Sequence, residues 1–126
     1  MNCLLGIDIG STSMKALVYD LEGNVLSHAS RPQVSIANDP AHPNWQVYLP
    51  ESIWNGIAAA IKDAVGLLGS DTRILAAAVT GLGADAVPLD ENGAPLYPFI
   101  NWLCTRTVPQ FEWWLEQVSL EKTFQI

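Results

Sequence analysis

Short apolar runs open the chain, separated by turns that contain glycine and aspartate. The first covers residues 4–9, the second residues 14–19 and the third residues 24–30. Runs of this length between such turns are typical of consecutive antiparallel strands. The first run is almost wholly apolar, which predicts a central strand covered on both faces. The start of the chain is therefore expected to form three adjacent strands of one sheet.

A proline-containing segment separates these strands from the first predicted helix. Residues 31–49 contain three prolines among other turn-forming residues and are expected to be irregular. Pro50 then suits the first position of a helix. Ile53, Ile57 and Ile61 recur at helical spacing and give one apolar stripe. This pattern predicts an amphipathic helix that packs against the sheet.

The second half of the chain carries further strand and helix signals. Residues 73–80 form another continuous apolar run, which predicts a second buried strand. Residues 86–89 and 96–100 flank an Asp-Glu-Asn-Gly turn and predict a hairpin. Thr107 suits a helix N-cap, and apolar residues after it share one face of a last helix. This mixed order of strands and helices indicates an α/β layer structure.

Composition supports one globular unit and narrows its partners. The 126 residues are 49% hydrophobic and 15% charged, which is ordinary for one domain with a core. The net charge of −7 argues against nucleic acid as a partner, because nucleic-acid binders need a basic face. No apolar stretch reaches membrane-spanning length, and the first residues lack the features of a signal peptide. Two cysteines without metal-like spacing fit a reducing compartment, so a cytoplasmic protein is expected.

The turn after the first predicted strand has the residues needed to hold a phosphate. Asp8 ends the strand, and Gly10, Ser11 and Thr12 follow. Glycine permits close approach, and successive turn amides and hydroxyls can surround phosphate oxygens. Asp8 can bind Mg²⁺ directly or through water, and Lys15 adds a positive charge nearby. The same residues also suit an ordinary hairpin turn, so this motif alone leaves both interpretations open.

Two later segments carry candidate ligands for a polyhydroxy compound. Gly83 permits close backbone approach, and Asp85 can accept hydrogen bonds from hydroxyl groups. Trp102 offers a flat face for a sugar ring, and Arg106 offers a planar fork of donors. A turn-capping Asp85, a core Trp102 and an Arg106 paired with a carboxylate would explain the same residues without a ligand.

Taken together, these segments resemble the FGGY carbohydrate kinases. The matching motifs are Asp8-x-Gly10-Ser11-Thr12-x-x-Lys15, Asp90-x-x-Gly93-x-Pro95-Leu96 and Trp102-x-x-x-Arg106. The resemblance implies the actin-like ATPase fold, also called ribonuclease H-like. This is an α/β fold with a mixed sheet, antiparallel first three strands and flanking helices. It also implies two domains with ATP and the sugar between them, and transfer of the γ-phosphoryl group of Mg-ATP to a sugar hydroxyl.

Details within the family resemble the L-fuculokinases. The shared motif is Trp102-x-Cys104-x-Arg106-Thr107. Most family members have aspartate where this chain has Cys104. The stretch around Asp85 is similar to the Gly-Val-Asp of fuculokinases and rhamnulokinases, which implies that Asp85 contacts the sugar. Leu82 departs from the usual aromatic residue, so L-rhamnulose, D-xylulose and D-gluconate stay open beside L-fuculose as substrates.

The family's general base and adenosine pocket come later in the chain, and no residue here matches them. The resemblance therefore implies that residues 1–126 are the N-terminal, sugar- and phosphate-binding part of the first domain. The rest of that domain and the second domain would be absent, the base would follow Ile126, and the chain alone would be inactive. Exposed apolar surface could then pair two copies as a homodimer. A rival hypothesis is a non-catalytic sugar-binding or regulatory protein with the same fold.

Overall fold

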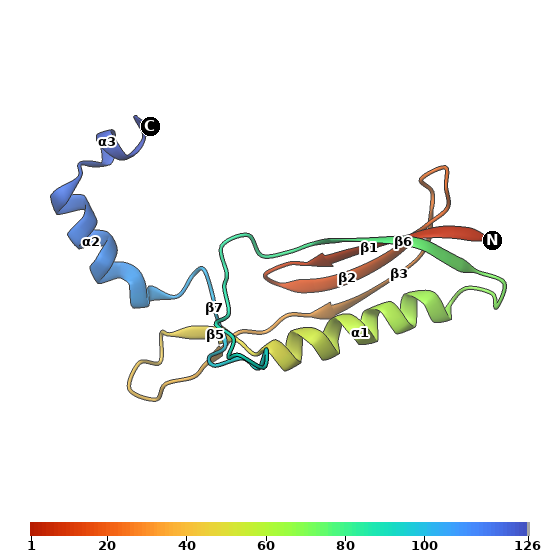
Figure 1. Cartoon of the computed structure of the whole chain (residues 1–126), viewed down its shortest axis with the longest axis horizontal. Helices are drawn as coiled ribbons and strands as arrows, with labels where there is room; N and C mark the ends of the chain where they lie inside the picture. Colours follow the sequence, from red (N-terminus) through yellow and green to blue (C-terminus); the bar gives the residue numbers. More distant parts are fainter. Residues whose placement is uncertain (126) are drawn as a thin grey trace.

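The computed structural model describes residues 1–125 and is built around a four-stranded sheet (Figure 1). In spatial order, its strands are β3 (Val25–Pro32), β2 (Ser13–Tyr19), β1 (Asn2–Ile9) and β6 (Arg73–Thr80). The pairs β1–β2 and β2–β3 are antiparallel, whereas β6 runs parallel to β1. The predicted antiparallel start is confirmed. The parallel pair requires a crossover connection, and α1 supplies it.

Helix α1 (Pro50–Gly66) covers one face of this sheet (Figure 1). It begins with proline in its first turn, as the sequence predicts. Small residues on the helix permit close packing, mainly on β2 and β3. The buried cluster consists of Cys3, Leu5, Met14, Ala16, Val18, Ile57, Ala60 and Ala64. The Ser27 hydroxyl of β3 donates a hydrogen bond to the Ala64 carbonyl at 2.7 Å. This layer of helix on sheet is the core of the chain.

The opposite face of the sheet is open in the described part of the chain. Along β1, Cys3 and Leu5 are buried under α1, whereas Leu4 on the other face is 38% exposed. Strand β6 is largely exposed on both faces, since even Val79, which lies in register with Ile7 on the same face as Leu5, is 65% exposed. The expectation that both strands are covered on two faces is therefore wrong for residues 1–125. An apolar run indicates that a strand suits a covered position, but it does not show which segment of protein covers it.

A second, smaller sheet lies at the start of α1. It contains β4 (Ile36–Ala37), β5 (Gln46–Tyr48) and β7 (Phe99–Ile100), with β5 in the centre and both pairs antiparallel. Residues 31–49 are thus not wholly irregular. The predicted hairpin of residues 86–100 is reduced to one bridge between Leu89 and Pro95, because the residues after it pair with β5 instead.

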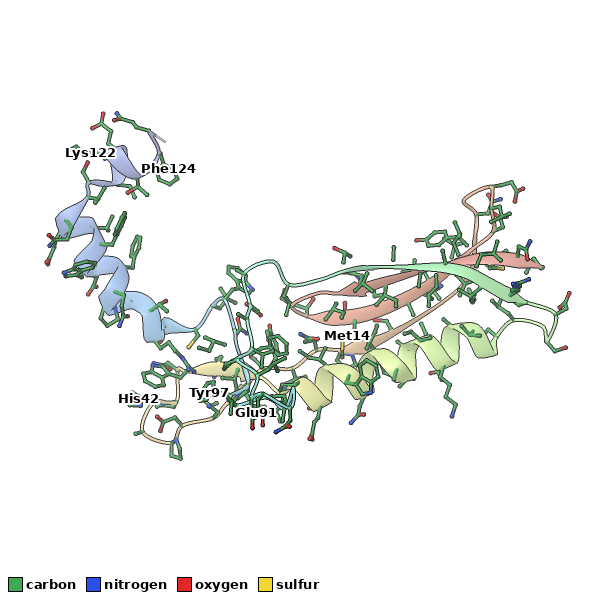
Figure 2. All side chains as sticks on the ribbon, in the orientation of Figure 1. Met14, His42, Glu91, Tyr97, Lys122 and Phe124 are labelled. Carbon is green, nitrogen blue, oxygen red and sulfur yellow. The ribbon has the colours of Figure 1, made fainter. Side chains whose placement is uncertain are left out.

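The last helices project away from the sheet (Figure 1). They are η1 (Thr105–Thr107), α2 (Val108–Gln117) and α3 (Leu120–Thr123). Thr107 occupies the predicted N-cap position of α2, but its side chain makes no capping hydrogen bond. Trp114 is 43% exposed, and Figure 2 shows the side chains of α2 extending into open space. The predicted apolar face of this helix therefore has no partner within residues 1–125. None of the helices in this range has the length and apolar character to cross a bilayer.

Candidate functional site

An open hollow of about 510 Å³ lies at the end of β1. Because β1 and β6 are parallel neighbours with Asp8 opposite Thr80, the residues that follow both strands meet at the same edge of the sheet. Three separate parts of the sequence line the hollow: Asp8, Ile9, Gly10 and Ser11; then Gly81, Leu82, Gly83, Ala84 and Asp85; then Trp102. The structure therefore brings six of the nine predicted site residues to one place.

The turn after β1 is tight and keeps two amides free. The Gly10 amide donates to the Ser13 carbonyl at 3.0 Å, and a Cβ on Gly10 would lie 3.1 Å from that oxygen. The backbone N–H of Gln33 donates to the Thr12 carbonyl at 2.9 Å. Within residues 1–125, the Ser11 and Thr12 amides donate to no acceptor. Consecutive unpaired amides in a turn suit an anion such as phosphate.

Asp8 and Lys15 lie opposite each other on β1 and β2. The Lys15 Nζ is 3.6 Å from an Asp8 carboxylate oxygen, and both side chains are partly exposed. Lys15 and Thr12 do not line the hollow. Exposed ion pairs contribute little stability, so Lys15 can exchange Asp8 for a phosphate oxygen at small cost.

The carboxylate of Asp8 fits Mg²⁺ only as part of a nucleotide complex. No group of three or more His, Cys, Asp or Glu side chains in residues 1–125 is placed to hold a metal ion by itself. Protein-bound Mg²⁺ commonly keeps several waters and uses one or two carboxylates together with substrate phosphates. One carboxylate beside an open turn with free amides meets that smaller requirement.

Asp85 is an acceptor without a partner. Both of its carboxylate oxygens are shielded from solvent and form no hydrogen bond within residues 1–125. Burial raises the pKa of Asp85; the nearby backbone N–H of Trp102 opposes this shift but forms no hydrogen bond with the carboxylate. Buried polar atoms are normally paired, so both oxygens have acceptor capacity that no group in residues 1–125 uses. Trp102 is 59% exposed and is therefore not a core residue.

The raised pKa of Asp85 predicts how stability depends on pH. The native carboxyl holds its proton to higher pH than the ordinary value of 3.8. The free energy of unfolding should therefore fall as the pH rises from about 3.8 through the native pKa. We expect Asp85→Asn to remove this fall and to be more stable than the parent chain at pH 7 in urea unfolding.

Asp20 provides a control of opposite sign. A hydrogen bond from the Asn24 side chain is the main cause that lowers the pKa of Asp20. The contribution of Asp20 to stability is therefore present above pH 3.8 and is lost as the pH falls through the native pKa. Asp20→Asn should therefore lose stability at pH 7 and approach the parent in acid. An Asp85→Asn chain less stable than the parent at pH 7 would contradict the interpretation of Asp85.

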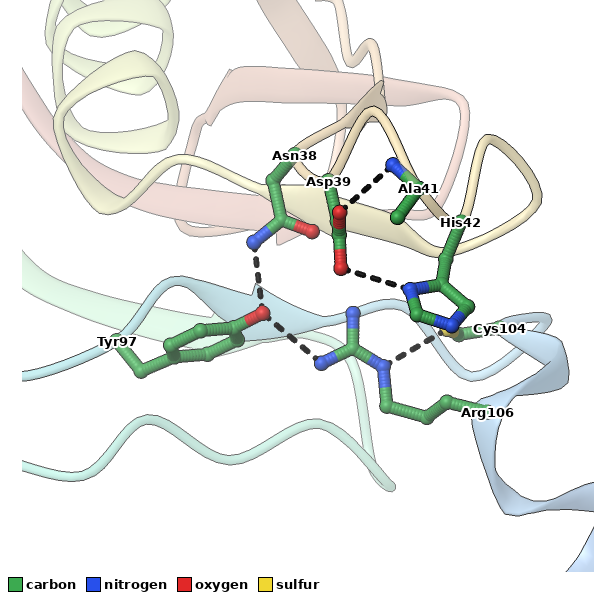
Figure 3. Close-up of polar contacts among 7 residues, drawn as sticks. All are labelled: Asn38, Asp39, Ala41, His42, Tyr97, Cys104 and Arg106. Atoms are coloured by element: carbon green, nitrogen blue, oxygen red, sulfur yellow. Dashed lines mark hydrogen bonds and ion pairs between the residues drawn. The ribbon is translucent and has the colours of Figure 1, made fainter.

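Arg106 lies outside the hollow, in a separate polar cluster (Figure 3). Its Nη1 donates to the Tyr97 hydroxyl at 3.1 Å, and its Nε donates to the Cys104 sulfur at 3.1 Å. The guanidinium carbon lies 4.7 Å from the centre of the Trp45 ring. The Asn38 side-chain amide also donates to the Tyr97 hydroxyl, at 2.7 Å. The structure therefore does not bring Arg106 together with Asp85.

Comparison with known proteins decides the family. The model of the FGGY family of carbohydrate kinases, N-terminal domain, matches residues 3–126. The chain belongs to the FGGY family. Members of the FGGY family use ATP, typically with Mg²⁺.

This FGGY chain is similar to kinases that are named for different substrates. The L-fuculokinase of Haemophilus influenzae is 30% identical over 132 aligned positions, covering 99% of this chain and 27% of that protein. The glycerol kinase of Thermococcus kodakarensis is 33% identical over 110 positions, covering 86% of this chain and 22% of that protein. The FGGY chain thus spans about a quarter of the length of the curated relatives that it matches.

Solved structures confirm the predicted fold. The FGGY chain superposes on xylulose kinase from Rhodospirillum rubrum with a TM-score of 0.80 and 31% identity, covering 94% of this chain and 24% of the other. It also superposes on Plasmodium falciparum glycerol kinase with ADP, with a TM-score of 0.82 and 23% identity, covering 94% and 24%. The second likeness shows the fold alone. The chain therefore has the α/β, actin-like ATPase architecture expected from its motifs.

Proposed function

We propose that this chain forms the phosphate- and sugar-contacting part of an ATP-dependent kinase that acts on a ketose such as L-fuculose. The observation that carries the proposal is the single hollow lined by the Gly10–Ser11 turn, by Asp85 and by Trp102. A phosphoryl transfer needs a donor phosphate and an acceptor hydroxyl side by side. The similarity to L-fuculokinase over 99% of the chain supports this ketose as the first candidate.

Each wall of the hollow has its own proposed role. The free amides of Ser11 and Thr12 bind phosphate oxygens, with Lys15 nearby, and Gly10 keeps the turn tight. Asp8 holds Mg²⁺ directly or through water, and the bound ion neutralises phosphate charge.

On the sugar side, Asp85 accepts hydrogen bonds from hydroxyl groups, and Trp102 covers one face of the ring. Gly83 has open space beside it, since a Cβ there would meet no atom within 4 Å. That space leaves room for the sugar next to the backbone. Arg106 reaches the sugar only if its contacts with Tyr97 and Cys104 open, because it does not line the hollow.

The proposal assigns no general base within this chain. The carboxylates that line the hollow, Asp8 and Asp85, already have proposed roles in binding the metal and the sugar. The expected position of the base, after Ile126, lies outside the described residues. We therefore propose that these residues function as the N-terminal part of a longer protein, here called the full-length kinase. Its remaining parts supply the base, the adenosine pocket and the second domain.

The test is an acceptor screen of the full-length kinase in the cytoplasmic pH range. Sugar-dependent ADP release from Mg-ATP is measured with L-fuculose, L-rhamnulose, D-xylulose, D-gluconate and glycerol. Glycerol is included because the glycerol kinase of Thermococcus kodakarensis is 33% identical. L-Fuculose should give the highest kcat/KM, and the isolated 126 residues should give no turnover. Absence of turnover with all five acceptors would overturn the proposal.

A further inference from the structure

Tyr48 connects the small sheet to the turn after β1. It is the last residue of β5 and is only 3% exposed. Its hydroxyl donates a hydrogen bond to the Ser11 carbonyl at 3.0 Å, across 37 residues of sequence. Burial, and after it the charge of Asp85, raises the pKa of Tyr48, while the Asn101 side chain opposes this shift. The phenol therefore stays a hydrogen-bond donor and lies near both walls of the hollow.

Two hydrogen bonds hold the carbonyl side of this turn to the rest of the protein. The Tyr48 hydroxyl donates to the Ser11 carbonyl, and the backbone N–H of Gln33 donates to the Thr12 carbonyl at 2.9 Å. No peptide bond in residues 1–125 is cis. In a trans peptide unit, the carbonyl and the following N–H point in opposite directions. Holding the Ser11 carbonyl therefore directs the Thr12 amide away from Tyr48, toward the exposed side of the turn.

We propose that Tyr48 is a positioning residue, whose hydroxyl fixes the Ser11–Thr12 peptide so that the Thr12 amide can bind a phosphate oxygen of Mg-ATP. This inference rests on the proposed function and adds a residue to it. Without the hydroxyl, the Ser11 carbonyl loses this donor and the peptide unit can rotate. A small misplacement of a group that contacts a reacting phosphate can reduce the rate strongly.

Tyr48→Phe in the full-length kinase tests this role, because it removes the hydroxyl and keeps the ring that packs in the core. We expect kcat to fall about tenfold, the size associated with loss of one hydrogen bond. The KM for Mg-ATP should rise several-fold, and the KM for the sugar should stay within about twofold of the parent value. Titration calorimetry with Mg-ADP should show weaker binding by the same several-fold factor.

Tyr19→Phe is the matched control. Tyr19 lies on β2, and its hydroxyl forms no hydrogen bond within residues 1–125, so this variant should match the parent in kcat and both KM values. A purely structural role of the Tyr48 hydroxyl would lower the melting temperature and the active fraction, with both KM values unchanged.

Three outcomes separate this inference from the proposed function. Parent-like kcat and Mg-ATP KM in Tyr48→Phe would overturn the role of Tyr48 and leave the kinase proposal intact. A lower active fraction with unchanged KM values would also overturn it. An inactive parent with every acceptor would overturn the proposed function, and this inference with it.

Discussion

Replacement of Asp8 by asparagine should lower kcat of the full-length kinase by about a thousandfold. Removal of one preorganised electrostatic contact to a transition state typically costs about 10²–10³ in rate, and a metal-binding carboxylate lies at the upper end. Asparagine keeps the size of the side chain, and Asp8 stands at the end of β1 with one partner, Lys15 at 3.6 Å. The fold should therefore persist while Mg²⁺ binding weakens. Sugar-dependent ADP release across a Mg²⁺ titration measures the effect.

Higher Mg²⁺ concentrations should recover part of the activity of Asp8→Asn, since the neutral amide is a weaker oxygen ligand than the carboxylate. Glu22→Gln serves as the control, because it removes one negative charge at an exposed turn remote from the hollow. If Asp8→Asn kept kcat within about threefold of the parent at equal Mg²⁺, the proposed metal role of Asp8 would be wrong.

The second large effect should come from Asp85→Asn. Hydrogen bonds to a charged group contribute about 1.5–3 kcal/mol each, so loss of two such contacts with the sugar should lower kcat/KM by roughly 10²–10⁴. The loss should appear mainly in the KM for the sugar and in kcat, with the KM for Mg-ATP unchanged. Steady-state kinetics with each substrate varied in turn separates these parameters.

The same substitution should make the chain more stable at neutral pH, because both carboxylate oxygens of Asp85 are shielded and unpaired within residues 1–125. A more stable and less active variant would indicate that Asp85 serves sugar binding at a cost in stability. Asp71→Asn is the control, as its side chain is exposed and distant from the hollow. Sugar kinetics of Asp85→Asn that equal those of Asp71→Asn would contradict the role in sugar binding.

Long periodic signals made the large sheet and α1 predictable. The apolar runs of β1 and β2 and the isoleucine stripe of α1 each extend over several residues, and turn residues separate them. The family motifs then indicated the fold. The first spans the turn after β1, the second lies at the turn bridged by Leu89 and Pro95, and the third follows β7. Strands β4 and β5 were missed, since two or three residues are too few to show an alternating pattern.

The residues of the candidate site were more predictable from the sequence than their arrangement in space. Asp8 and Asp85 meet because β1 and β6 are parallel neighbours, which the sequence order of a strand, a helix and a strand already favours. Arg106 was expected beside them, but its position depends on Trp45 and Tyr97, which approach it through tertiary contacts. Tyr48 was missed as a site residue for the same reason, because its contact with Ser11 is a tertiary contact that joins residues 37 positions apart in the sequence.

Strand β6 has one further consequence. It is paired with β1 along one edge, and its other edge has no neighbour among residues 1–125. An apolar strand with free amides and carbonyls can pair with any extended segment that reaches it. In solutions of the isolated chain, strands of neighbouring copies are the most abundant such segments. The chain should therefore aggregate faster as its concentration rises.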